Sequence, residues 1–187
     1  MRKKTMTIAS EKLIQDLIER TRLNINQAEY FSTLSTINLN WKARPNNWSI
    51  LECLEHLNLY GDFYIPEINK KIESSKATSK KNFKSGVLGN YFAKSMLPKE
   101  KLNKMKTFKD KNPSGSTWNK TTIARFISQQ EQLLNLLDKS RNIDLNKTKT
   151  ARSITNLIKL KLGDTFRVIV YHNERHLVQA NSTVERS

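Results

Sequence analysis

The sequence predicts an all-α fold: a four-helix bundle with a long lysine-rich crossover between the second and third helices. Apolar residues recur at helical spacing in four segments, and alternating runs of Val, Ile, Thr and aromatic residues, which are typical of strands, are missing. Gly (5) and Pro (4) are scarce in the 187 residues, which argues against collagen-like or disordered chains. This length suits one domain, so we expect a single domain over residues 1–187.

The first two helices are expected at about residues 8–32 and 49–72. One apolar stripe marks the first of them: Ile14, Leu17, Ile18, Thr21, Ile25 and Ala28. At the start of the second, Ser49 and Glu52 have the spacing of a capping box, in which each side chain bonds the other residue's backbone N–H. Pro66 removes a hydrogen bond and predicts a kink or a restart of this helix.

Residues 70–111 form the predicted crossover and differ from the rest of the chain in charge. They contain 13 lysines and three acidic residues, in a chain whose 33 Lys and Arg and 17 Asp and Glu give a formal net charge of +16. Most of the positive charge therefore lies on one connection.

The third and fourth helices are expected at about residues 119–139 and 163–181. The last helix carries one face made of Val168, Ile169, His172, His176, Gln179 and Ala180. The segment 148–162 before it is compatible with a loop or a short helical turn. Bundles of this kind usually build their sites from side chains on facing helices.

We expect a soluble, cytoplasmic protein. Charges at Glu11, Lys12 and Asp16 interrupt any apolar core of a signal peptide, and no window approaches the ~20 apolar residues that cross a bilayer. The single cysteine, Cys53, cannot form an internal disulfide, which suits a reducing interior. We expect it to be a small buried hydrophobe.

All three histidines fall on inward helix faces. His172 and His176 are four residues apart, which places their Cβ atoms about 5–6 Å from each other on one face. His56 shares a face of the second helix with Cys53 and Tyr60. Facing helices would bring the three imidazoles together as an open metal site, with positions left for water or substrate, as in catalytic sites.

A second interpretation of the histidines stays open. A histidine on a semi-apolar face is commonly a hydrogen-bonded core residue, and an H-x3-H spacing also arises by chance. The metal interpretation gains weight because every histidine in this Lys- and Asn-rich chain falls on an inward face.

Two segments, RPNNWSILECLEHLNLY (44–60) and LKLGDTFRVIVYHNERHLVQ (160–179), resemble the two signature helices of the DinB-like superfamily of bacterial four-helix proteins. In that family a Trp-Ser pair precedes the second helix and its inward histidine, and the last helix presents H-x3-H followed by Gln. The resemblance covers nearly the whole chain, including FKSGVLGNYF and KMKTF. It implies that His56, His172 and His176 bind a divalent metal, with water completing the coordination.

The resemblance also implies a class of activity. Members bind zinc, nickel, iron or manganese, and imidazole ligands do not choose among these ions. Members with a known activity include thiol transferases, which join a low-molecular-weight thiol to an electrophile. We therefore expect a metal-dependent hydrolase or thiol S-transferase with a small-molecule substrate, a thiol being one candidate. Relatives often pair as dimers, so a homodimer is one candidate, and the sequence leaves the oligomeric state open.

Two more residues are predicted to act beside the metal as catalytic groups, Tyr60 and Gln179, each about one turn beyond a predicted ligand. The Tyr60 hydroxyl can donate to a bound oxyanion. The Gln179 amide can orient a bound water or a neighbouring imidazole, and an interhelical hydrogen bond is an equally open role. Glu55 and Glu174 lie around the helix from the ligands and are expected to face solvent.

The basic charge leaves one alternative function. The lysines cluster on one connection, Arg is sparse there and no known motif occurs, so no specific nucleic-acid partner is expected. A non-catalytic bundle that uses its basic surface to bind an acidic partner remains open. It predicts that charge reversal at Lys80, Lys81 and Lys84 abolishes the interaction and keeps the fold.

Overall fold

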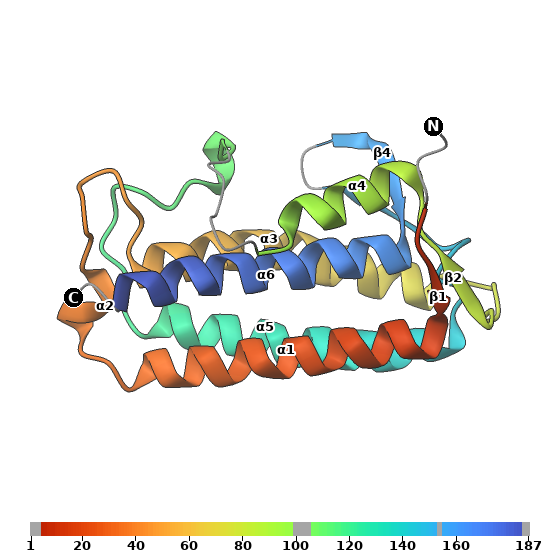
Figure 1. Cartoon of the computed structure of the whole chain (residues 1–187), viewed down its shortest axis with the longest axis horizontal. Helices are drawn as coiled ribbons and strands as arrows, with labels where there is room; N and C mark the ends of the chain where they lie inside the picture. Colours follow the sequence, from red (N-terminus) through yellow and green to blue (C-terminus); the bar gives the residue numbers. More distant parts are fainter. Residues whose placement is uncertain (1–4, 99–105, 153–154, 185–187) are drawn as a thin grey trace.

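A computed structural model, which describes residues 5–98, 106–152 and 155–184, confirms the predicted all-α bundle (Figure 1). Its four long helices lie close to their predicted bounds: α1 (Ser10–Ser32), α3 (Ile50–Glu73), α5 (Thr121–Lys139) and α6 (Leu162–Val184). They form a ring in which α1 and α3 each contact both α5 and α6.

The direction of these helices explains why a long crossover connects α3 to α5. Figure 1 shows α3 and α5 running the same way along the bundle, opposite to α1 and α6. Two consecutive helices that run in parallel need a connection that returns along the bundle. The lysine-rich segment provides it.

The sequence sets the start of α3 as predicted. The Ser49 hydroxyl accepts a hydrogen bond from the Glu52 N–H at 3.2 Å, and the Glu52 carboxylate accepts one from the Ser49 N–H at 2.9 Å, which closes the capping box. Helix α3 then continues through Pro66, so the predicted restart is wrong. Pro66 is exposed, where water can satisfy the carbonyl group that loses its donor.

The crossover contains structure that the sequence pattern did not predict. Strand β2 (Asn82–Lys84) pairs antiparallel with β1 (Thr7–Ala9), and helix α4 (Val87–Met96) packs against α6. In the described part of the chain, short helices also lie in the connections between the long ones: α2 (Thr36–Asn40), η1 (Lys109–Lys111) and η2 (Ser140–Asn142).

The segment 148–162 forms neither of the predicted alternatives. It is an antiparallel hairpin of β3 (Lys149–Arg152) and β4 (Thr155–Lys161), in which Thr150 pairs with Leu160. Both of these side chains are buried, so one face of the hairpin packs against the end of the bundle.

The apolar core consists of two clusters along the bundle. On α3 the change from one cluster to the other falls between Leu57 and Tyr64, and on α6 it falls between Tyr171 and Leu177. His172 and His176 lie within this interval on α6, and His56 directly precedes Leu57 on α3.

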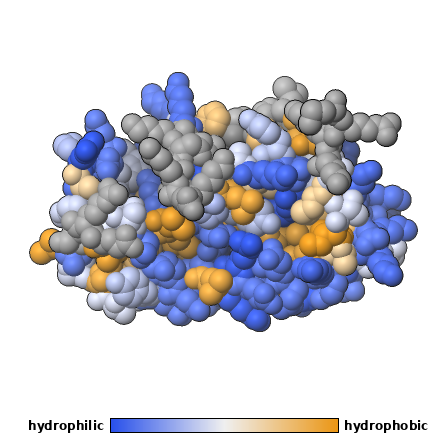
Figure 2. All heavy atoms as spheres, in the orientation of Figure 1, coloured by the Kyte–Doolittle hydropathy of each residue, from blue (hydrophilic) through white to orange (hydrophobic). Residues whose placement is uncertain are grey.

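The face shown in Figure 2 is mostly hydrophilic, with apolar residues in separate patches. None of the helices in the described part of the chain is long and apolar enough to cross a membrane.

Candidate metal centre

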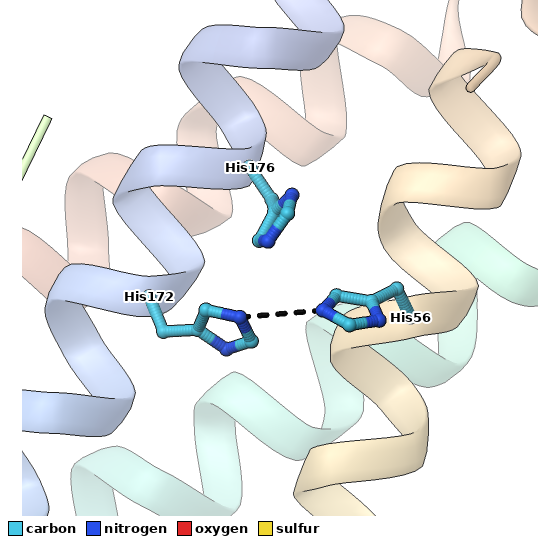
Figure 3. A group of neighbouring side chains, drawn as sticks. All are labelled: His56, His172 and His176. Atoms are coloured by element: carbon cyan, nitrogen blue, oxygen red, sulfur yellow. Dashed lines mark hydrogen bonds between the residues drawn. The ribbon is translucent and has the colours of Figure 1, made fainter. Parts of the chain in front are cut away.

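The three histidines converge from two helices, with His56 on α3 and His172 and His176 on α6 (Figure 3). One nitrogen from each ring lies within 4.8 Å of the others. The Nε2 atoms of His56 and His172 are 3.3 Å apart. Two nitrogens bound at about 2.0–2.1 Å to one tetrahedral ion would lie roughly 3.3 Å apart, so this spacing suits a shared cation.

Two carbonyl groups fix the orientation of these rings. His56 Nδ1 lies 2.7 Å from the Lys111 backbone oxygen, and His176 Nδ1 lies 3.0 Å from Gln179 Oε1. Because a carbonyl oxygen only accepts, each Nδ1 carries the proton and donates it. In the neutral rings the Nε2 lone pairs are then left for the centre of the cluster.

Burial keeps the imidazoles neutral. His56 and His172 are buried and His176 is half-buried. Burial is the largest cause that lowers the pKa of His56 to about 4 and that of His176 to about 3. It also lowers the pKa of His172 well below its ordinary value, with further contributions from the charges of His176, His56 and Arg175. Neutral imidazole is the form that binds metal.

Two aromatic side chains flank the histidines. The Trp48 ring centroid lies 4.8 Å from that of His56 and 5.7 Å from that of His176. The Tyr60 ring meets His56 and His172 edge-on, with ring centroids 5.0 and 4.8 Å apart. These contacts hold the rings in place and limit water around them.

A cavity of about 1110 Å³ opens beside the histidines. All three histidines line it, together with Tyr60 and Gln179. Helix α4 supplies part of the opposite wall through Tyr91, Phe92, Ser95 and Met96. This volume is enough for a small-molecule ligand, since such sites commonly measure about 300–1,000 Å³.

Comparison with protein families matches residues 18–180 to a family model of the DinB superfamily. The chain belongs to the DinB superfamily. In this DinB superfamily member the matched span includes the three histidines, Tyr60 and Gln179. Comparisons with curated proteins and with solved structures give no match.

A buried polar network holds α4 over the cavity of this DinB superfamily member. The Asp164 carboxylate at the start of α6 accepts hydrogen bonds from the Ser85 hydroxyl and, at 2.8 Å, from the Gly86 N–H, just before α4. Arg167 donates to Asp164 at 3.1 Å and to Asn90 on α4 at 3.2 Å. The side chains of α4 that line the cavity are therefore positioned from α6.

Two acidic residues of the DinB chain differ from the sequence prediction. Glu55 is buried, not solvent-facing, because Arg125 of α5 pairs with it at 3.0 Å. Glu174 is half-buried and pairs with Arg20 of α1 at 2.8 Å. Neither lines the cavity. Cys53 is fully buried as predicted, and burial raises the pKa of its thiol.

Three groups at the site were not predicted: the Trp48 ring, the Lys111 carbonyl and the Arg175 side chain. Trp48 lines the cavity just before the cap of α3. Arg175 also lines it, and its place three residues after His172 was a readable signal, since such residues share a helix side. A backbone carbonyl has no sequence signature, so nothing in the chain marked Lys111.

Proposed function

We propose that this DinB superfamily member is a metal-dependent enzyme that acts on a small molecule, as a hydrolase or a thiol S-transferase. His56, His172 and His176 are the proposed ligands. The observation that carries the proposal is the convergence of three neutral imidazoles on the wall of a cavity of about 1110 Å³, two of them, His56 and His176, oriented through their Nδ1 atoms.

The chemistry of these donors fits a divalent cation. Imidazole nitrogens suit zinc, nickel and iron, and three protein ligands leave coordination positions for water or substrate. Such an ion, when bound, supplies positive charge that lowers the pKa of a bound water or thiol.

The other residues at the site have separate proposed roles. The Lys111 carbonyl and the Gln179 amide oxygen accept hydrogen bonds from the Nδ1–H groups of His56 and His176, and so position these rings. Gln179 is therefore best described as a positioning residue. Tyr60 lies against His56 and His172 in the cavity wall, and its hydroxyl would donate to the oxygen on which negative charge develops.

Metal content tests the ligand set. Protein purified without a nickel column and reconstituted with zinc, nickel, manganese or ferrous iron should hold one ion per chain. His176→Ala should lose most of this metal, whereas Ser182→Ala, a change in the same cavity wall, should retain it. Failure of the unaltered protein to hold stoichiometric metal with any of the four ions would refute the site.

Turnover tests the reaction. The metal-loaded protein is assayed with small thiols plus electrophiles, and with a panel of amides and esters. On whichever substrate is turned over, Tyr60→Phe should lower kcat by about 10²-fold and leave the metal content unchanged, because it removes one donor to the developing charge. An unchanged kcat would exclude this role for Tyr60.

A further inference from the structure

We propose that Arg175 binds a carboxylate of the substrate inside the cavity, so that the enzyme acts on carboxylates with an apolar or aromatic body. This inference rests on the proposed function in one respect, because it treats the ligand of the cavity as the substrate of the enzyme. The binding of a carboxylate by Arg175 does not depend on that function and is argued from the residues that line the cavity.

The position of Arg175 is the first argument. It lies on α6 between the two proposed ligands of that helix, three residues after His172 and next to His176, and it lines the same cavity. Arg175 is only 4% exposed. A guanidinium withdrawn from bulk water beside a ligand-sized cavity is placed to interact with a ligand that enters it.

The charge of the cavity is the second argument. Among the described residues that line it, Arg175 and Lys106 are cationic and none is acidic. The Lys111 ammonium lies nearby, 5.9 Å from the Tyr60 ring centroid. The three histidines are neutral at pH 7 because their pKa values are lowered. The described part of the wall therefore presents net positive charge to whatever enters, which favours an anion.

The proposed metal strengthens this charge. Three neutral imidazoles leave a divalent ion with its full double charge, in contrast to carboxylate or thiolate ligands. Bringing this charge close to Arg175 is unfavourable in a partly desolvated space. A bound anion offsets both charges, so the anion and the metal should favour each other's binding.

The shape of the site selects the kind of anion. A guanidinium presents planar, parallel N–H donors that match the two oxygens of a carboxylate. Much of the surrounding wall is aromatic or apolar, with Phe92 and Met96 from α4 and Phe108 at the exposed side. One end of the ligand is thus matched to Arg175, and its body to these side chains.

The test compares phenylacetate with its neutral counterpart phenylacetamide by isothermal titration calorimetry, on protein as purified and again after zinc loading. The unaltered protein should bind phenylacetate at least about tenfold more tightly, the scale of a charge-assisted hydrogen bond. Arg175→Gln should remove this preference, and Arg175→Lys should keep only part of it. Arg44→Gln, an exposed arginine outside the cavity lining, should leave it unchanged.

The outcomes separate this inference from the proposed function. A preference that survives in Arg175→Gln, or that falls equally in Arg44→Gln, overturns the role of Arg175. Binding of phenyl phosphate through Arg175 without binding of phenylacetate overturns the carboxylate class. Circular dichroism verifies the fold of each variant, and Arg175→Lys keeps the test valid if Arg175→Gln unfolds. A protein that holds one zinc per chain but shows no preference keeps the metal site and loses this inference.

Discussion

Helix α6 carries two buried arginines, eight residues apart, whose surroundings differ in charge. Arg167 is 2% exposed and lies 3.1 Å from the Asp164 carboxylate, with Ser85 and Asn90 as further partners. Arg175 is 4% exposed, and the described residues that line its cavity include no carboxylate.

By our proposal, Arg167 has a structural role and Arg175 has a role in binding on the same helix. The counter-charge of Arg167 is part of the fold, and the resulting network fixes α4. The counter-charge in the cavity beside Arg175 is, by our proposal, brought by the substrate. Removal of the first charge pair should therefore cost stability, whereas removal of Arg175 should cost binding.

The largest effect is expected for Asp164→Ala. It leaves Arg167 as an uncompensated buried charge and removes the acceptor of Ser85 and Gly86, so the free energy of unfolding should fall by about 3–5 kcal/mol. Chemical denaturation measures this loss. Asp138→Ala, which breaks an exposed pair with Arg141, should cost less than about 1 kcal/mol. Equal losses in the two variants would contradict a structural role for the buried pair.

Lowering the pH should destabilise the metal-free protein through His56 and His176. The folded pKa of His56 is about 4 and that of His176 about 3, both below the ordinary 6.5, so the unfolded chain binds more protons between these values. The stability of the metal-free protein should thus be full above pH 6.5 and fall as the pH drops toward 4, by roughly 3 kcal/mol from His56 alone. Denaturation at several pH values measures it. His56→Gln should flatten the profile, and an unchanged slope would contradict the assignment.

Arg175→Gln should change stability little, within about 1 kcal/mol, in contrast to Asp164→Ala. Burial lowers the pKa of Arg175, so we expect a neutral side chain of similar length to be tolerated at this position. Thermal unfolding of the ligand-free protein is the measurement. A loss comparable with that of Asp164→Ala would mean that Arg175, too, is a structural charge.

The smallest effect is expected for Lys80, Lys81 and Lys84 changed together to Glu. All three are exposed at the β1–β2 end of the molecule, so stability should change by less than about 1 kcal/mol, and the phenylacetate preference should stay the same. A loss of that preference would mean that the general positive charge of the surface, not Arg175, attracts the ligand. Loss of an acidic protein partner would instead support the alternative of a binding protein.

Local patterns explain which parts of the fold could be predicted. The bundle helices have long apolar stripes, the capping box needs only Ser49 and Glu52, and the convergence of His172 and His176 follows from helical spacing. Helix α4 has only ten residues within a lysine-rich segment, and its position depends on Asp164, far away in sequence. The burial of Glu55 likewise depends on Arg125 of another helix, which no local pattern reveals.

The hydrogen bond from His56 to the Lys111 carbonyl constrains the backbone of the crossover and not its side chains. A main-chain acceptor survives a change of side chain, so this hydrogen bond, and with it the tautomer of the ring, does not depend on which side chain residue 111 carries. The backbone path of η1 is not free in the same way, because the carbonyl must stay within hydrogen-bond distance of the imidazole. Related chains should thus tolerate substitution at this position far better than a displacement of the η1 backbone.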